Sequence, residues 1–373
     1  MRKIGFVSSS VGWGGLEMNI LKLSQWLTER NWELTLFVNK ESRLYAESKK
    51  FNIKTQVIPN HLKYFDFIGA YRFSKVLKAH EISTIFVFDN RDLDFINITK
   101  KLTFKNLVVI YQQHMQIGVN KKDLIHTIRF SGINYWITPL DILKKEVEEK
   151  TRVDANKIKV IPLGIEIDKF IHAKYQKNEA RDKLDINQSA FLLGILGRID
   201  PKKGQLFLVQ AIHEFKKRNI NIELLIIGDP TLNDPNSLEY LATIQDYIGK
   251  NSLTNSVHFR NFTCDVGLFY NAIDLFALAS ESETYGMVTI EAMLSKVPII
   301  ATNSSGTPEI LNYGEFGLLY TGNNMEDFMN KFSWIIENSE EAESIASKAQ
   351  QHAIERYAHS EECKLIEELL IRA

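Results

Sequence analysis

The sequence predicts an α/β protein of two domains, each a parallel β-sheet wound with helices on both faces. The chain of 373 residues is too long for one ordinary hydrophobic core, and its 45% hydrophobic content is too high for a disordered chain. Short β-branched or aromatic runs alternate with segments of helical periodicity in both halves. An extended stretch that contains Pro162 and Gly164 separates the two series. We expect the interdomain linker there.

The elements can be assigned in chain order. In the first half, helical periodicity at 15–30 and 69–80 lies between apolar runs of strand type. The strands expected in this half are residues 4–7, 34–38, 84–88, 107–111 and 135–138. Those expected in the second half are 191–196, 222–227, 257–259, 275–279 and 297–301. We therefore expect domains at 1–165 and 166–356, with a C-terminal helix at about 357–373 as a candidate to pack back on the first.

Charge is divided unevenly between the halves, although the net charge is −1. Residues 1–175 contain 28 Lys and Arg against 18 Asp and Glu, whereas the remainder contains 17 against 28. A basic first half suits an anionic partner such as a phospholipid surface, a lipid-linked phosphate or an anionic glycan. A solvated lysine-rich surface explains the same count, so both interpretations stay open.

The location of the protein follows from what the sequence lacks. Cys264 and Cys363 are too far apart for a disulfide framework or a metal cluster. No run of about 18 apolar residues is present, and the apolar start is too short for a signal peptide. We expect a cytoplasmic protein, with peripheral contact to the inner face of the membrane as an open option.

A glycine loop follows the first expected strand, at Gly12-Trp-Gly-Gly-Leu-Glu17. Glu17 stands where a dinucleotide-binding fingerprint needs its third glycine, which disfavours a dehydrogenase. A glycine loop at a helix N-terminus allows backbone N–H groups to approach an anion. A plain tight turn is the alternative interpretation.

Two cations follow the first strand of the second domain. Arg198 and Lys203 would lie at the carboxyl end of that strand, where open α/β sheets bind ligands. Two cations directed at a diphosphate can neutralise it as a leaving group. Lys202 is interpreted as an ordinary loop lysine.

The stretch 281–294 contains two carboxylates, Glu283 and Glu291, around Gly286. If a helix begins near Gly286, the N–H groups that precede its first turn suit a phosphate or sugar hydroxyls. Carboxylates accept hydrogen bonds from hydroxyl pairs, so a ribose or hexose is a natural ligand. A solvated helix face would explain either glutamate alone.

Together these motifs resemble the family 4 glycosyltransferases of the GT-B fold. The resemblance rests on Gly14-Gly15 with Glu17, on Gly197-Arg198 with Lys203, on the Glu283 to Glu291 motif and on Gly306-Thr-Pro-Glu309, in the family's order. It implies two Rossmann-like domains that face each other across a cleft. It also implies transfer of a hexose-type sugar, with retention, from a nucleotide diphosphate sugar, for which UDP is favoured.

The resemblance further implies a glycan or lipid-linked acceptor, as in cell-surface polysaccharide or lipopolysaccharide synthesis, no nucleic-acid partner, no cofactor and no metal. The implied catalytic residues are His114, Glu283, Arg198 and Lys203. The implied donor-binding residues are Gly14, Gly15, Arg198, Lys203, Glu283, Thr284, Tyr285, Gly286 and Glu291. The implied base-proximal residues are Arg260, Asn261 and Phe262, with Arg260-Asn261 where the family usually has glycine after the strand.

Acceptor specificity is expected in the variable loops 59–67 and 116–122. Their basic and aromatic residues would suit an anionic or lipid-linked glycan; these are His61, Lys63, Tyr64, Phe65, Lys121 and Lys122. Two alternatives use the same architecture: a nucleotide-sugar epimerase and a non-catalytic nucleotide-sugar-binding scaffold. Isomerised donor without an acceptor would identify the first, and turnover would exclude the second.

Overall fold

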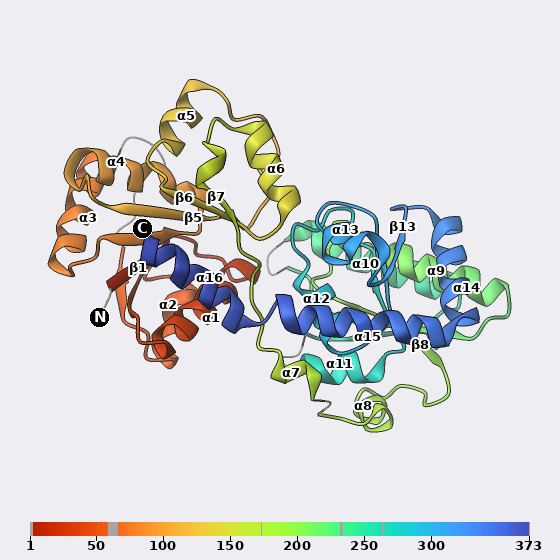
Figure 1. The fold of residues 1–373 in the computed structure, drawn as a ribbon. Coiled ribbons are helices and arrows are strands. Elements are labelled where there is room, and N and C mark those ends of the chain that lie inside the picture. The colour runs from red at the N-terminus through yellow and green to blue at the C-terminus, as the bar shows by residue number, and fades with distance from the viewer. Residues whose placement is uncertain (1–2, 59–65, 173, 232–233, 263–264, 373) are drawn as a thin grey trace. The chain divides into compact units, whose positions relative to one another are not determined.

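The computed structural model describes residues 3–58, 66–172, 174–231, 234–262 and 265–372 and divides the chain into two compact units (Figure 1). The first unit runs to Ile165 and includes the C-terminal segment from His359, and the second unit is Glu166–Ala358. The acceptor-loop residues His61, Lys63, Tyr64 and Phe65 lie outside the described residues.

The described part of the first unit contains a seven-stranded sheet in the order β3-β2-β1-β4-β5-β6-β7. All neighbouring strands are parallel. The strands are β1 (Lys3–Ser8), β2 (Glu33–Val38), β3 (Thr55–Val57), β4 (Thr84–Val87), β5 (Val108–Gln112), β6 (Tyr135–Thr138) and β7 (Ile158–Val160). The strand order reverses between β1 and β4, which defines a topological switch point.

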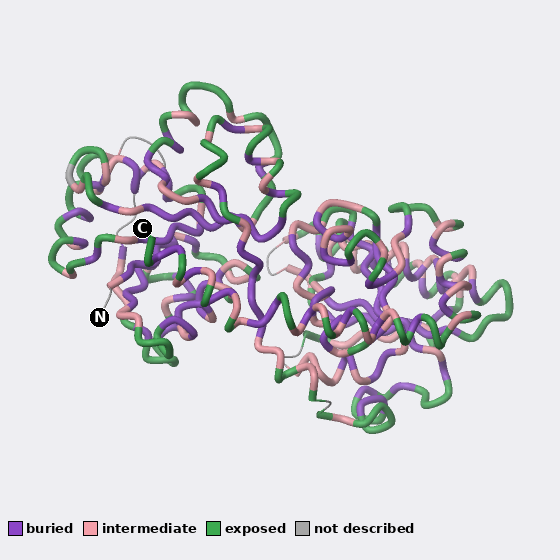
Figure 2. Tube along the Cα trace, viewed as in Figure 1, coloured by how far each residue is buried: buried purple, intermediate pink, exposed green. Residues whose placement is uncertain are grey.

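Helices cover both faces of this sheet because its strands are apolar on both sides. Phe6 on β1 joins the core cluster under α1, α2 and α16, whereas the next residue, Val7, joins the cluster under α3 and α4. Figure 2 shows these strands as buried. The helices are α1 (Gly15–Glu29), α2 (Arg43–Lys50), α3 (Phe67–Ala79), α4 (Leu93–Thr103), α5 (Leu124–Phe130), α6 (Asp141–Lys150) and α16 (His359–Arg372), with short turns η1 (Asn90–Asp92) and η2 (Ala155–Lys157).

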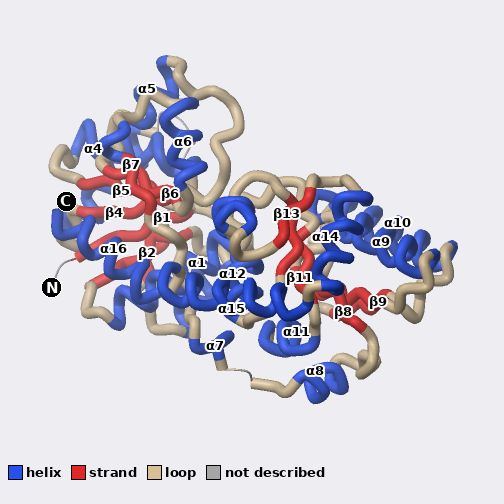
Figure 3. Tube along the Cα trace, turned by 45° about the vertical axis from the view of Figure 1, so that its right-hand side comes forward, coloured by secondary structure: helices blue, strands red, loops and turns tan. Residues whose placement is uncertain are grey.

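The second unit repeats the plan with a six-stranded parallel sheet in the order β10-β9-β8-β11-β12-β13 (Figure 3). The strands are β8 (Phe191–Leu196), β9 (Ile222–Ile227), β10 (Val257–Arg260), β11 (Leu275–Leu278), β12 (Ile299–Thr302) and β13 (Leu318–Tyr320). The order reverses between β8 and β11. Each unit is thus a doubly wound Rossmann-like domain, and this predicted fold class is confirmed.

Helices and short turns complete the second unit. They are α7 (Asp168–Ile171), α8 (Lys177–Lys183), η3 (Pro201–Lys203), α9 (Gln205–Lys217), α10 (Pro235–Lys250), α11 (Val266–Ala272), α12 (Met287–Leu294), α13 (Thr307–Ile310), η4 (Asn312–Gly314), α14 (Met325–Glu337) and α15 (Ser339–Arg356). One core cluster of this unit joins β8, β9 and β11 to α9, α10 and α14.

The last helix, α16, packs on the first unit, although it follows the second unit in the chain. Cys363 and Ile366 join the core cluster that also contains Trp26 of α1. Glu367 accepts hydrogen bonds from Arg30, at 2.6 Å, and from the Trp32 indole, at 3.0 Å. Apolar packing and this ion pair therefore hold the C-terminal segment against α1.

A buried carboxylate joins α16 to the place where the chain leaves the first unit. Glu362 is 4% exposed and accepts hydrogen bonds from the Gly164 N–H, at 2.7 Å, and the Gln112 amide, at 3.3 Å. A Cβ on Gly164 would lie 2.5 Å from the His359 Cα, so only glycine fits there. The His359 N–H donates to the Ile165 carbonyl at 3.0 Å. The segment around Gly164, where the chain leaves the first unit, is therefore hydrogen-bonded to the segment around His359, where it returns.

Burial raises the pKa of Glu362 to about 7, even though its two hydrogen-bond donors favour the charged form. The side-chain carbonyl oxygen of Gln112, Oε1, is buried and has no hydrogen-bond partner among the described residues. A protonated Glu362 could donate to this oxygen after a 180° turn of the Gln112 amide. The protonated form of the carboxyl therefore satisfies more of the buried polar atoms.

We expect Glu362 to make the unfolding free energy depend on pH. The pKa of Glu362 is higher in the folded than in the unfolded chain. Its stabilising contribution to the unfolding free energy is therefore complete below about pH 4.5 and is lost as pH rises through about 7. Between pH 5 and pH 8, the unfolding free energy of the wild type should therefore fall by roughly 2–3 kcal/mol more than that of Glu362→Gln. Urea unfolding of both proteins at the two pH values measures this difference. Equal pH dependence in the two proteins would contradict the assignment.

Candidate active site

The loops that follow β8 and β11 meet at the switch point of the second unit. These strands are neighbours, so their carboxyl ends lie at the same edge of the sheet. The Glu281 N–H donates to the Lys202 carbonyl at 2.9 Å. Gly204 has a φ of 74°, and a Cβ on it would lie 2.2 Å from the Ala279 carbonyl oxygen. Only glycine allows both this backbone conformation and this approach of the two loops.

This approach brings Lys203 and Glu283 into a direct ion pair, with 2.5 Å between Nζ and Oε2. Their side chains are 28% and 17% exposed, so water reaches the pair only in part. Ser280 also donates to Glu283 Oε2, at 3.4 Å, and the Gly306 N–H donates to the Glu283 carbonyl at 3.0 Å. Two residues that are 80 positions apart in the sequence therefore form one charged centre.

Arg198 lies on the same β8 loop and is exposed. Its backbone is fixed because the Gln205 amide donates to its carbonyl at 2.7 Å. Its guanidinium forms no ion pair with any residue that the structure describes. Arg198 therefore supplies a positive charge that is not neutralised within the described chain, beside a lysine that is paired.

Helix α12 begins next to this pair. Gly286 is its N-cap, with φ 67° and ψ 58°, and the Glu283 Cγ lies 3.0 Å from where a Cβ on Gly286 would stand. Tyr285 is buried and makes an edge contact with Tyr357, whereas Thr284 is half-buried. The first N–H groups of a helix have no acceptor within the helix. The N-terminus of α12 can therefore bind an anion or sugar hydroxyls beside Glu283.

Glu291 lies one turn into α12 and is half-buried. The Tyr270 hydroxyl, on α11, lies 3.0 Å from Glu291 Oε2 and 2.9 Å from the Val288 carbonyl, and it can donate to either. Burial and the neighbouring Glu291 raise the pKa of Tyr270 well above its ordinary value. Tyr270 therefore stays protonated and holds the Glu291 carboxylate in place.

The three residues expected near a base have different surroundings. The Arg260 guanidinium donates to the carbonyls of Leu184 and Asp185, at 2.9 and 3.3 Å, just after the end of α8. Asn261 and Phe262 are exposed, and the Phe262 N–H donates to the Asp229 carboxylate at 3.3 Å. Arg260 thus has a structural role, whereas Asn261 and Phe262 remain accessible.

In the first unit, the glycine loop is organised by Glu17, which is 5% exposed. Its carboxylate accepts hydrogen bonds from Ser10 Oγ, at 2.5 Å, and from the Gly14 N–H, at 2.8 Å. The Gly14 N–H is therefore engaged in this structure. A Cβ on Gly15 would have no neighbouring atom within 4 Å, so the space above Gly15 is open.

His114 follows β5 in the first unit. Its Nε2 is buried without a hydrogen-bond partner among the described residues, and its ring centre lies 6.0 Å from that of Phe88. Burial lowers the pKa of His114 to about 4. The imidazole is therefore neutral at physiological pH and can act as a hydrogen-bonding group, but not as a standing cation.

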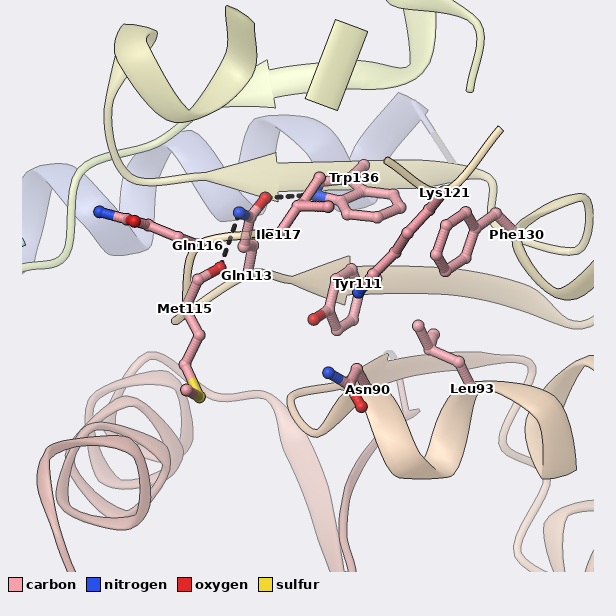
Figure 4. Close-up of a pocket in the computed structure, with 10 residues that line it drawn as sticks. All are labelled: Asn90, Leu93, Tyr111, Gln113, Met115, Gln116, Ile117, Lys121, Phe130 and Trp136. Carbon is pink, nitrogen blue, oxygen red and sulfur yellow. Dashed lines mark hydrogen bonds between the residues drawn. The ribbon is translucent and has the colours of Figure 1, made fainter. Parts of the chain in front are cut away.

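A small pocket of about 30 Å³, partly open to solvent, lies beside β5 in the first unit (Figure 4). Its walls come from the sheet, from α4 and α5 and from the loop after β5. They are formed by Asn90, Leu93, Tyr111, Gln113, Met115, Gln116, Ile117, Lys121, Phe130 and Trp136. Gln113 accepts from the Trp136 indole and donates to the Met115 carbonyl, both at 2.8 Å. The pocket is thus small and combines aromatic rings with polar side chains.

The described residues contain neither a metal-binding cluster nor a helix that could span a membrane. No group of three or more His, Cys, Asp or Glu side chains is arranged to hold a metal ion. In the same residues, no helix combines the length and the apolar character that crossing a membrane requires.

Comparison with known families assigns both units. Residues 13–169 match the model described as Glycosyltransferase Family 4, and residues 176–352 match the model described as Glycosyl transferases group 1. The two matches together take in most of the chain and correspond to the two units. This chain belongs to the family 4 glycosyltransferases. The resemblance predicted from the sequence motifs is therefore confirmed.

Individual relatives are more distant. The D-inositol 3-phosphate glycosyltransferase of Corynebacterium urealyticum is 30% identical to this glycosyltransferase over 60% of this chain and 53% of its own. The capsular polysaccharide biosynthesis glycosyltransferase CapM of Staphylococcus aureus is 26% identical over 58% of this chain and 56% of its own. The matched segment thus spans about half the length of these curated relatives.

A solved structure supports the fold over the full length. Anabaena Alr3699/HepE, crystallised in complex with UDP and glucose, superposes with a TM-score of 0.84 at 21% identity, over 100% of both chains. This similarity establishes the GT-B architecture of the glycosyltransferase, two parallel-sheet Rossmann-like domains, as the sequence motifs predicted.

Sequence reasoning missed several residues that shape the candidate site. Tyr270 is 21 positions from Glu291, and no local pattern marks it as a partner. The pocket residues Tyr111 and Trp136 have the appearance of ordinary strand residues. One signal could have indicated the role of Trp136. It lies in the expected strand 135–138, which follows the expected strand 107–111 that ends shortly before His114.

We expect His114 to remain neutral over the whole physiological range. Because burial holds its pKa at about 4, the ¹⁵N chemical shifts of its imidazole should not change between about pH 5.5 and pH 8. The signals can be assigned by their loss in His114→Asn. A titration of the assigned signals with a midpoint near the ordinary histidine value would contradict the buried environment.

Proposed function

We propose that this glycosyltransferase transfers a hexose-type sugar from a UDP-sugar to a glycan or lipid-linked acceptor, with retention and without a bound metal. The observation that supports it most is the Lys203–Glu283 pair at the switch point, beside Arg198 and the N-terminus of α12. The UDP and glucose bound by Anabaena Alr3699/HepE support the choice of donor. Capsule synthesis by CapM supports a cell-surface glycan as the product class.

In the proposed reaction, Arg198 and Lys203 neutralise the diphosphate as it leaves the sugar. Charge on a leaving group develops in the transition state, so fixed cations lower the barrier there. Lys203 can exchange its contact with Glu283 for one with the phosphate, and the released Glu283 carboxylate can accept hydrogen bonds from the sugar hydroxyls. Glu291, held by Tyr270, accepts the hydrogen bonds of the ribose hydroxyls.

The bond changes balance without a further reactant. The bond between the anomeric carbon and the phosphate oxygen breaks, and a bond to the acceptor oxygen forms on the same face of the sugar. The acceptor proton passes to the departing phosphate. Neutral His114 supplies a hydrogen bond to the transferred sugar, and Gly15 leaves room for the diphosphate.

Substitution of Arg198 or Lys203 by Ala should lower turnover by roughly 10²–10³-fold, because each removes one charge that stabilises the leaving group. Lys202→Ala is the matched control, since Lys202 is exposed on the same loop. Release of UDP from UDP-sugar with an acceptor in EDTA measures turnover, and a thermal unfolding curve checks the fold. Near wild-type turnover in the Arg198 and Lys203 variants would contradict the proposal. Isomerised donor without an acceptor would indicate an epimerase.

Donor binding can be measured separately from turnover. Calorimetric titration with UDP and with GDP in EDTA should show binding of UDP, and Glu291→Ala should weaken it about tenfold or more because hydrogen bonds to a charged group contribute about 1.5–3 kcal/mol. Tyr270→Phe, which keeps the carboxylate but removes its support, should give a smaller loss. Binding that requires added Mg²⁺ would contradict metal independence, and unaltered binding by Glu291→Ala would contradict the ribose role.

A further inference from the structure

Five large apolar side chains are exposed between residues 115 and 128 of the first unit. We call them the α5 face: Met115, Val119, Leu124, Ile125 and Ile128, which are 74%, 72%, 69%, 65% and 51% exposed. Figure 2 shows α5 and the loop before it as largely exposed. Single exposed apolar residues are normal, but three on one side of a short helix, as Leu124, Ile125 and Ile128 are on α5, suit an interaction surface.

The fold holds this apolar side outward. Leu124, Ile125 and Ile128 lie within about 100° of one another around α5, because successive helical residues are rotated by about 100°. The buried residues of the helix are Arg129 and Phe130. The Asn97 amide donates to the Ile128 carbonyl at 2.8 Å and anchors the last turn to α4. The core of the first unit is thus satisfied without these three side chains.

A lysine flanks α5 at each end, whereas the Glu146 carboxylate contacts the loop before it through the Ile117 and Gly118 N–H groups. Lys122 directly precedes α5 and is exposed, and exposed Lys101 of α4 donates to Ser131 Oγ, at 2.7 Å, beside the last turn of α5. The one carboxylate of this segment, Asp123, caps α5 and contacts the His126 ring at 2.6 Å. Exposed apolar side chains flanked by lysines are complementary to a bilayer that carries anionic headgroups.

The α5 face also adjoins the pocket of the first unit. Met115 belongs to both, and Lys121 lines the pocket directly before Lys122 (Figure 4). Phe130 of α5 forms another wall. A surface that rests on lipid would therefore place this pocket at the level of the headgroups.

We propose that the α5 face is a membrane-docking surface whose partner is an anionic lipid bilayer. This inference deepens the proposed function and rests on it. If the chain transfers a sugar as proposed, docking on a membrane favours a lipid-linked acceptor over a soluble glycan. The apolar side chains enter the boundary between headgroups and acyl chains, and Lys101 and Lys122 contact lipid phosphates.

Flotation of the full chain with vesicles tests the surface. Vesicles of phosphatidylcholine with phosphatidylglycerol should bind the wild type at low salt, and pure phosphatidylcholine should bind it less. In a triple variant, Leu124→Ser with Ile125→Ser and Ile128→Ser, the partition coefficient onto these vesicles should fall by about tenfold or more. The reason is that partition scales with the apolar area that enters the membrane. Lys101→Gln with Lys122→Gln should weaken binding to the anionic vesicles only.

The matched control exchanges three exposed apolar residues from other elements. Phe51→Ser with Leu238→Ser and Ile371→Ser changes side chains that are 49%, 55% and 64% exposed, and it should bind vesicles as the wild type does. UDP titration of every variant reports the donor site, so failure of docking and failure of the proposed function give different results.

Three outcomes would overturn the inference. The wild type could stay unbound to anionic vesicles at low salt, or the α5 triple variant could bind them as tightly as the wild type. In the third outcome, neither protein binds lipid, and size-exclusion chromatography shows that the wild type is an oligomer whereas the triple variant is not. The α5 face would then be an interface between copies of the chain.

Discussion

Parallel strand pairing is the constraint on which both units depend. Each strand in a parallel sheet needs a crossover to reach its neighbour, so helices cover both faces and all carboxyl ends lie at one edge. The strand order reverses beside β1 in the first unit and beside β8 in the second, and the loops on either side of that point diverge. Gly14, Lys203 and Glu283 all lie in loops of this kind.

In the second unit, local backbone chemistry turns that edge into a charged centre. Gly204 lets the β8 loop approach Ala279 on the β11 side, and the hydrogen bond from Glu281 to Lys202 fixes the approach. Lys203 and Glu283 then meet at the start of α12. A cation, a carboxylate and a helix N-terminus gathered in one place fit a ligand that is both a phosphate and a polyol.

The first unit combines three features that the proposed function relates to an acceptor. A neutral His114 follows the strand beside the pocket, the pocket has aromatic walls, and the loop that rims it continues into the exposed α5 face. The chain returns to this unit through α16, where Glu362 ties Gly164 to the end of β5. The C-terminal segment is therefore part of the structure that supports His114.

The sequence by itself determined the doubly wound fold, most strands and the family, because apolar periodicity and the order of short motifs are local properties. It missed β3, β7 and β13, which are three residues each and too short to show a period. Only the tertiary structure decided the pairing of Lys203 with Glu283, the support of Glu291 by Tyr270 and the burial of Glu362, since each joins residues far apart in the chain. It also decided that Arg260 caps the end of α8 and that α5 turns its apolar side to solvent, because burial depends on neighbours that periodicity does not identify.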